Sequence, residues 1–117
     1  MRILIVEDES SVRSFLQNAM KALRRSVKID TATHGADGLK LARRQWYDLI
    51  ITDYHMPKMN GLDMTYYLRQ EGYTTPIVVI SADPMIEQDS LAAGASLFLL
   101  KPVSLENLRY MLDVFGL

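Results

Sequence analysis

Short apolar runs alternate with amphipathic segments along the whole chain, and this alternation constrains the fold more than any other feature. The five runs are Ile3–Val6, Val27–Ala32, Leu49–Thr52, Ile77–Ile80 and Leu97–Leu100. All except the second, which is weaker, are continuous rather than alternating with polar residues. Continuous runs of this length are typical of strands that are covered on both faces of a sheet. The sequence therefore predicts five strands at these positions.

The segments between the runs have the spacing of helices. Apolar residues from Val12 to Leu23 recur at three- and four-residue steps, which is the pattern of one helical face. A second apolar stripe predicts a helix over residues 36–46. Caps and stops predict the remaining helices, over residues 61–71, 83–94 and 104–115. Strand and helix thus alternate through the chain. We predict an α/β fold in one domain, residues 1–117, with a doubly wound parallel sheet and helices on both faces.

Composition excludes several functional classes. The 13 Lys and Arg residues balance 14 Asp and Glu residues, so the chain lacks the basic excess typical of domains that bind nucleic acid directly. It has no cysteine, which excludes disulfides and thiolate sites. The first apolar run is too short for a signal peptide or a membrane span. We expect a cytoplasmic domain without membrane contact, either free-standing or part of a longer protein.

Reactive side chains follow four of the predicted strands. In open parallel sheets, ligands bind at the carboxyl ends of the strands. The groups delivered there are Glu7, Asp8 and Glu9 after the first run, Asp53 after the third, Ser81 after the fourth and Lys101 after the fifth. The second run ends in Thr33 and His34, and we expect His34 to be an ordinary loop residue. One edge of the sheet therefore gathers an acidic, a basic and a hydroxyl group.

This combination of groups suits phosphoryl chemistry. Converging carboxylates repel one another, and a hard divalent cation such as Mg²⁺ relieves that repulsion. A lysine and a hydroxyl complement the oxygens of a phosphoryl group, and charge neutralisation does most of the catalysis in phosphoryl transfer. Taken singly, the residues also have ordinary structural interpretations. Asp8 could cap the first helix, and Lys101 with Pro102 could form a turn.

Four segments, in this order and spacing, resemble the receiver domain of two-component response regulators. They are Ile3–Glu9, Asp48–Pro57 continued by Met59–Gly61, Pro76–Ala82, and Gly94–Pro102. The likeness covers essentially the whole chain. It implies a flavodoxin-like (βα)5 fold with strand order 2-1-3-4-5.

The resemblance assigns roles in the acidic part of the site. Asp53 would be the nucleophile and phosphoacceptor. Asp8 would bind Mg²⁺ directly (or Mn²⁺), Glu7 would bind it through water, and Asp53 would supply a further oxygen. His55 would contribute its backbone carbonyl.

It also assigns roles around the phosphoryl group. Lys101 would pair with a phosphoryl oxygen, and the peptide bond before Pro102 would be cis. Ser81 would turn its hydroxyl toward the phosphoryl group, coupled to a rotating aromatic, Phe98. Phe98 could equally be a simple core residue. His55 and Asp83 would tune the lifetime of the phosphoryl group.

The implied function is a phosphorylation switch. A histidine kinase or histidine phosphotransfer protein would donate the phosphoryl group to Asp53, and the face built from the fourth helix, fifth strand and fifth helix would shift toward an effector that the sequence does not identify. The chain would catalyse its own modification but would not be an enzyme with a diffusible substrate.

Three alternatives stay open. A phosphohydrolase of the haloacid-dehalogenase type also uses an aspartate after a strand, but it needs a second acid where this chain has His55. A flavodoxin-like FMN protein needs a phosphate cradle where this chain has Glu7, Asp8 and Glu9. A receiver that signals by contact alone would not need the set Asp8, Asp53, Ser81 and Lys101.

Overall fold

Five parallel strands form a single sheet in the order β2-β1-β3-β4-β5. The computed structural model describes residues 1–117. Its strands are β1 (Arg2–Val6), β2 (Lys28–Ala32), β3 (Leu49–Asp53), β4 (Ile77–Ser81) and β5 (Leu97–Leu100). Its helices are α1 (Ser10–Leu23), α2 (Gly35–Arg44), α3 (Gly61–Gln70), α4 (Glu87–Ala93) and α5 (Leu105–Val114). The predicted fold class and strand order are confirmed.

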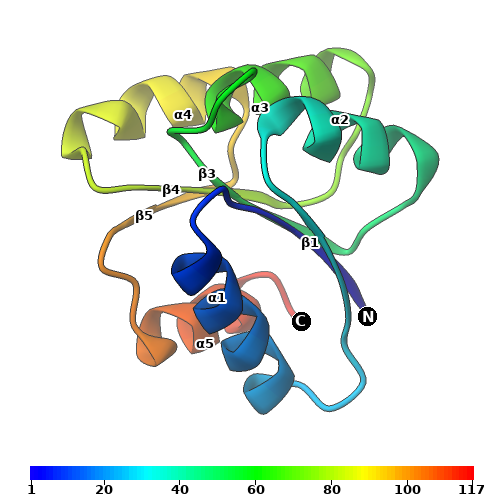
Figure 1. Cartoon of the computed structure of the whole chain (residues 1–117), viewed down its shortest axis with the longest axis vertical. Coiled ribbons are helices and arrows are strands. Elements are labelled where there is room, and N and C mark those ends of the chain that lie inside the picture. The colour runs from blue at the N-terminus through cyan, green and yellow to red at the C-terminus, as the bar shows by residue number, and fades with distance from the viewer.

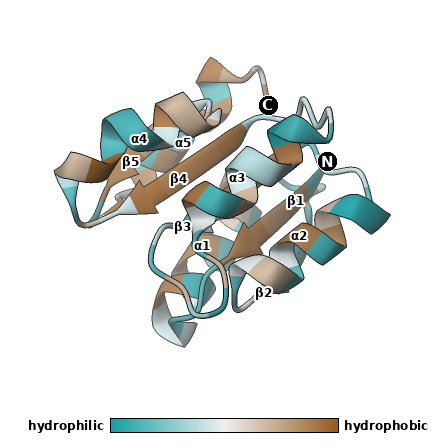
Figure 2. Ribbon diagram, turned by 90° about the horizontal axis from the view of Figure 1, so that it is seen from above, coloured by the Kyte–Doolittle hydropathy of each residue, from teal (hydrophilic) through white to brown (hydrophobic).

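The helices cover both faces of the sheet, as Figure 1 shows, with α1 and α5 on one face and α2, α3 and α4 on the other. Each face has its own apolar cluster. Ile3 and Ile51 point into the cluster beneath α1 and α5, whereas Leu4 and Ile50 point into the opposite one. Every residue of β3 and β4 is buried. The strands β1 and β4 accordingly appear hydrophobic in Figure 2, while the helices show mixed colours.

The prediction that Leu97–Leu100 is covered on both faces is wrong. The strand β5 lies at the edge of the sheet, none of its residues is fully buried, and the Leu100 side chain is 49% exposed. An edge strand has a neighbouring strand on one side only, so its covering depends on the helices beside it. The result is a partly open apolar edge next to α4 and α5.

The helix predicted to begin at Asp83 and Pro84 is split in two. The Asp83 side chain caps a 3₁₀ turn, η1 (Pro84–Ile86), by accepting the Met85 N–H at 2.9 Å. The α-helix α4 begins only at Glu87. A first turn of 3₁₀ geometry is common at helix ends. The predicted cap is therefore correct, but the helix that follows is shorter.

His34 has a structural role that the sequence analysis did not assign. It is the N-cap of α2, and its Nδ1 accepts the N–H of Asp37 at 3.2 Å. The expectation of an ordinary loop residue is therefore wrong.

None of the helices combines the length and the apolar character needed to cross a bilayer.

Candidate functional site

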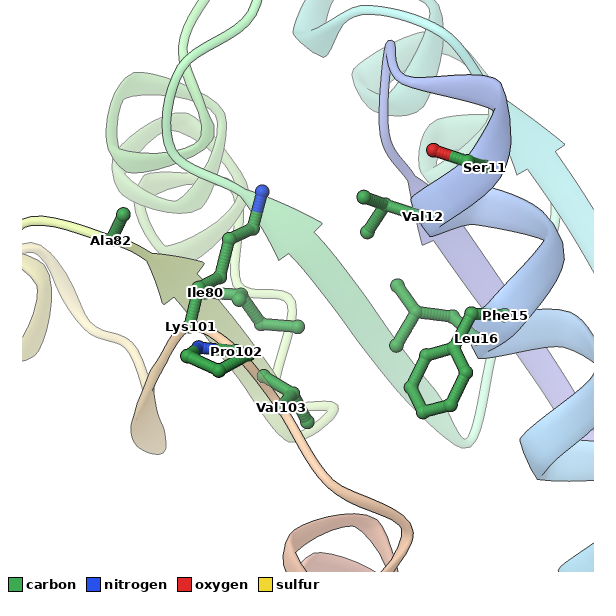
Figure 3. Close-up of a pocket in the computed structure, with 9 residues that line it drawn as sticks. All are labelled: Ser11, Val12, Phe15, Leu16, Ile80, Ala82, Lys101, Pro102 and Val103. Carbon is green, nitrogen blue, oxygen red and sulfur yellow. The ribbon is translucent and has the colours of Figure 1, made fainter.

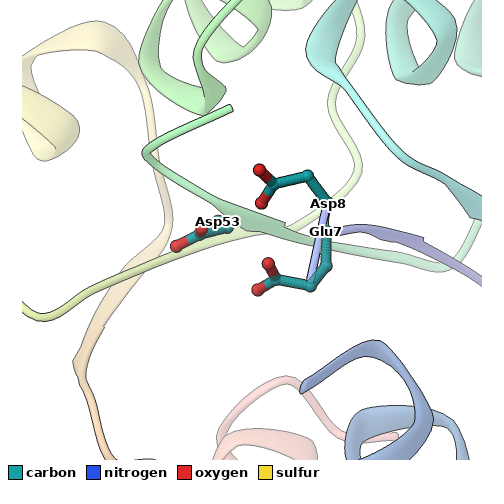
Figure 4. Close-up of side chains that lie close together, drawn as sticks. All are labelled: Glu7, Asp8 and Asp53. Carbon is teal, nitrogen blue, oxygen red and sulfur yellow. The ribbon is translucent and has the colours of Figure 1, made fainter. Parts of the chain in front are cut away.

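Three carboxylates meet at the carboxyl edge of the sheet. Asp53 is the last residue of β3, and Glu7 and Asp8 directly follow β1. Oxygens of the three side chains lie within 4.8 Å of one another, as Figure 4 shows. Asp8 is exposed, whereas Glu7 is 1% and Asp53 7% exposed. The sequence-based expectation that these residues converge is confirmed.

Asp8 does not cap the first helix. The N-cap position of α1 belongs to Glu9, and no side chain makes the capping hydrogen bond there. The backbone N–H of Glu9 instead donates to Oε2 of Glu7 at 3.1 Å. The carboxylate of Asp8 is thus not used in capping α1 and remains part of the acidic cluster.

Lys101 joins the acidic cluster from the end of β5. Its Nζ lies 3.1 Å from Oδ1 of Asp53 and 3.5 Å from Oε1 of Glu7. Its backbone N–H donates to the carbonyl of Ser81 at 2.9 Å, which ties the ends of β4 and β5 together. The Lys101–Pro102 peptide bond is cis, as the resemblance implied.

Burial dominates the electrostatics of the two enclosed carboxylates. It raises the pKa of Glu7 to about 7, against the opposing effect of the Glu9 N–H. Burial also raises the pKa of Asp53, which the hydrogen bond from Lys101 opposes. The pKa of Lys101 is raised because its bonds to Asp53 and Glu7 outweigh its own partial burial. The positive charge of one lysine thus balances only part of the negative charge of the three carboxylates.

The donor set fits a hard divalent cation. Glu7, Asp8 and Asp53 offer oxygen ligands only, close enough to share one ion, and oxygen ligands are what Mg²⁺ prefers. A cation there would also offset the carboxylate charge that Lys101 leaves uncompensated.

Ser81 and Phe98 lie on the neighbouring strands β4 and β5, with Ser81 at the carboxyl end of its strand and Phe98 two register positions before that end. The Ser81 side chain is buried, and its Oγ accepts the N–H of Asp83 at 3.1 Å. Phe98 is opposite Val79 in the register between β4 and β5. It is half-buried and belongs to neither apolar cluster, so it is not a simple core residue. Its switching role stays a prediction.

His55 lies two residues after Asp53, and its side chain is exposed. Its ring lies edge-on to that of Tyr54, with the two ring centroids 4.6 Å apart. Asp83 is exposed and caps the turn after β4. The roles of both residues in phosphoryl lifetime, and that of the His55 carbonyl in metal binding, stay predictions.

Two residues that shape the site were missed from the sequence. Arg13 on α1 donates from Nη1 to the backbone carbonyl of Glu7 at 2.9 Å. Gly61 begins α3 so close to β3 that a Cβ there would lie 2.2 Å from the carbonyl oxygen of Asp53. The glycine within the Met59–Gly61 segment was visible in the sequence, but the close approach that requires it was not. Nothing in the sequence showed the direction of the Arg13 side chain.

An apolar groove adjoins the acidic cluster. Its volume is about 430 Å³, and Lys101 is among the residues that line it. Figure 3 shows one wall formed by Val12, Phe15 and Leu16 of α1, and the other by Pro102 and Val103. The Phe15 side chain is 43% exposed. Lys101 thus belongs both to the acidic cluster and to the groove.

Comparisons with known proteins agree on one family. The family model described as "Response regulator receiver domain" matches residues 3–113. The chain is 38% identical to the response regulator ArlR of Staphylococcus aureus over 92% of its own length and 48% of that protein. It is also 38% identical to the hybrid signal transduction histidine kinase G of Dictyostelium discoideum, over 99% of its own length but 4% of the kinase. The chain therefore spans about half the length of the first of these relatives and a small part of the other.

A solved structure matches over nearly the whole chain. The response regulator TrrA from Thermotoga maritima, solved in complex with Mg²⁺ and BeF, superimposes with a TM-score of 0.87. The two chains are 29% identical, and the match covers 97% of each.

Proposed function

This chain belongs to the family of response regulator receiver domains, and on that premise we propose that it accepts a phosphoryl group on Asp53 and signals by a change of shape. The donor is a histidine kinase or a histidine phosphotransfer protein. The observation that carries the proposal is the pairing of the Asp53 carboxylate with Lys101, beside Glu7 and Asp8.

The transfer step uses the Asp53 carboxylate as the nucleophile. One carboxylate oxygen attacks the phosphorus of a phosphohistidine in line with its P–N bond. The new O–P bond forms as the P–N bond breaks, and the electron pair of that bond stays on the imidazole nitrogen. Lys101 moves its charge from the Asp53 carboxylate to an oxygen of the arriving phosphoryl group. Water later hydrolyses the aspartyl phosphate and restores Asp53.

Glu7, Asp8 and Asp53, with the backbone carbonyl of His55, would hold Mg²⁺ (or Mn²⁺). When bound, the ion supplies positive charge that neutralises the oxygens of the transferring group. The buried Glu7 keeps its place through the N–H of Glu9 and the ammonium group of Lys101.

The groove between α1 and Pro102–Val103 gives the donor a docking surface. It is apolar, open, and continuous with the acceptor site through Lys101. A helix of the donor that carries the phosphohistidine and an apolar face would bury Phe15 and Val103 while presenting its phosphoryl group to Asp53.

The phosphoryl group would then attract the Ser81 hydroxyl away from Asp83, and Phe98 would turn inward from its half-buried position on β5. This shifts an existing equilibrium at the face built from α4, β5 and α5, where an effector protein or domain binds. His55 and Asp83 would tune how long the phosphoryl group survives.

The chain modifies itself without turning over a diffusible substrate, works in the cytoplasm, and does not bind nucleic acid directly.

Intact mass after incubation with acetyl phosphate and Mg²⁺ tests the proposal. We expect the wild-type chain to gain one phosphoryl group, and the Asp53→Asn variant and an EDTA sample to gain none. Asp48→Asn, which changes an exposed aspartate before β3, is the matched control and should be modified like the wild type. A folded wild-type chain that gains no mass would favour a receiver that signals by contact alone.

A further inference from the structure

The helix α4 is held to the body of the protein by few side chains. Ser90 is its only buried residue, and the Ser90 hydroxyl bonds back to the carbonyl of Ile86 at 2.7 Å, one turn earlier. By contrast, α5 buries Leu108, Met111 and Leu112. Leu91 of α4 is 45% exposed. Little apolar burial therefore stabilises α4, and such elements open or move at low free-energy cost.

The C-terminal end of α4 is nevertheless fixed by a side chain from α3. Nε of Arg69 donates to the carbonyl of Gly94 at 2.9 Å, and Nη2 lies 3.3 Å from Oγ of Ser96. Nη1 donates to the carbonyl of Tyr73, in the loop between α3 and β4. One guanidinium group thus joins the end of α4 to the loops that precede the strands β4 and β5.

Gly94 permits this contact. Its φ of +113° lies in the left-handed region, which ends the helix and favours glycine. A Cβ at this position would lie 2.5 Å from Cγ of Arg69. The aliphatic part of Arg69 therefore passes directly over the end of α4, in space that only glycine leaves open.

The N-terminal end of α4 is connected to the acceptor site instead. The Ser81 hydroxyl accepts the N–H of Asp83 at 3.1 Å, and the Asp83 carboxylate accepts the N–H of Met85 at 2.9 Å. The turn η1 carries this connection into α4. If Ser81 turned toward a phosphoryl group, the N–H of Asp83 would lose its partner, while the contacts of Arg69 would be unaffected.

We propose that Arg69 is a fixed anchor for the C-terminal end of α4. Phosphorylation then moves the other end, which consists of η1 and the first turn of α4, while the anchored end stays in place. The displacement rests on the proposed function, whereas the anchor itself does not. Arg69 is a positioning residue in this mechanism and takes no part in phosphoryl transfer.

Amide hydrogen exchange on the whole chain tests the anchor without any phosphoryl analogue. In Arg69→Met, which keeps an unbranched apolar side chain but removes the donors, we expect the amides of Gly94 and Ala95 to exchange about tenfold faster. Tenfold is the change expected from losing roughly one hydrogen bond that involves a charged group. Arg43→Met is the matched control, because the guanidinium of Arg43, on α2, bonds to the carboxylate of Glu71 at the end of α3.

The pattern of exchange separates anchoring from general destabilisation. The anchor predicts faster exchange at the end of α4 with little change in β1 and β3, whereas a loss of global stability accelerates all of them. Unchanged exchange at Gly94 and Ala95, or a uniform increase, would overturn the proposal. If Arg69→Met does not fold, Arg69→Lys keeps the charge and should give a smaller local increase of the same kind.

Adding beryllofluoride and Mg²⁺ to the same samples tests the pivot. In the wild type we expect exchange to change at least about threefold at Met85 and Ile86 and to stay constant at Gly94 and Ala95. In Arg69→Met both ends should respond. An equal response at both ends of wild-type α4 contradicts the pivot. A fluorine NMR signal of bound beryllofluoride reports the acceptor site separately, so its absence would count against the proposed function and leave the test of the anchor intact.

Discussion

Lys101 is the only basic side chain that pairs with Asp53 and Glu7. Replacing it with methionine keeps its length but removes the charge that would meet the phosphoryl oxygens. We expect Lys101→Met to lower the rate of phosphorylation by acetyl phosphate about 100-fold, the usual cost of losing a donor that stabilises a transition state. Intact mass against time measures this rate. Lys40→Met, at an exposed position of α2, should react like the wild type, and a reactive Lys101→Met would remove Lys101 from the transfer step.

Tyr47 shows how a single polar atom is satisfied within the core. Its side chain is fully buried, and its hydroxyl donates to Oδ2 of Asp30 at 2.7 Å. Burial raises the pKa of Tyr47, and the bond to Asp30 adds to this effect, so the hydroxyl remains a donor at neutral pH. We expect Tyr47→Phe to lower the free energy of unfolding by about 1 kcal/mol.

Urea unfolding followed by circular dichroism measures this loss. Tyr110→Phe is the control, because Tyr110 is 61% exposed and exposed substitutions usually change stability by less than about 0.5 kcal/mol. Equal effects of the two substitutions would contradict the role given to the bond between Tyr47 and Asp30.

At the level of whole elements, the helices differ in how their first turns are satisfied. Ser104 accepts the N–H of Asn107 at 3.1 Å, and the Asn107 side chain accepts the N–H of Ser104 at 3.0 Å. We expect Ser104→Ala to cost about 1 kcal/mol of stability, the usual value for an N-cap. Glu9→Ala is the control, because Glu9 occupies the N-cap of α1 without a capping bond. Thermal unfolding of both variants tests the difference, and a Ser104→Ala variant as stable as Glu9→Ala would contradict it.

The positions of the strands were predictable from the local sequence, but how deeply each strand is buried was not. The runs Leu49–Thr52 and Ile77–Ile80 became central strands that are buried throughout. Leu97–Leu100 has the same character but lies at the sheet edge. Composition alone does not distinguish a central strand from an edge strand, because covering is a property of the assembled sheet.

The acidic site was predictable for a related reason. Parallel strands deliver their carboxyl ends to one edge, so Glu7, Asp8, Asp53 and Lys101 had to meet there once the strands were assigned. The contacts of Arg13 and Arg69 were not predictable, because each joins a helical side chain to a backbone carbonyl elsewhere. Such contacts depend on side-chain direction and helix packing, which apolar periodicity does not specify.

For the molecule as a whole, the enclosed carboxylates link stability to pH when metal is removed. Burial raises the pKa of Glu7 from 4.5 to about 7, so between these values the folded chain holds a proton that the unfolded chain has lost. The free energy of unfolding in EDTA should therefore fall as pH rises through this window and level off above about pH 7. The raised pKa of Asp53 acts in the same direction.

Urea unfolding in EDTA at pH 5.5 and pH 8 measures this change. The Glu7→Gln variant, which does not titrate at this position, should lose less stability between the two pH values. Adding Mg²⁺ at pH 8 should stabilise the wild-type chain, because a ligand that binds only the folded state favours it. A wild-type chain that is equally stable at both pH values, or indifferent to Mg²⁺, would contradict this account of the cluster.

The position of the single tryptophan gives the molecule a selective optical reporter. Trp46 stacks on Tyr73, with ring centroids 4.6 Å apart, and its side chain is 58% exposed. Trp46 precedes β3, and Asp53 is the last residue of that strand. The two residues are therefore separated by the length of a five-residue strand, roughly 16 Å. The aromatic neighbour of Asp53 in the chain is Tyr54. Tryptophan emission should therefore follow the separation of Trp46 from Tyr73 during unfolding and remain insensitive to phosphorylation, so that folding can be monitored in a sample whose acceptor is being modified.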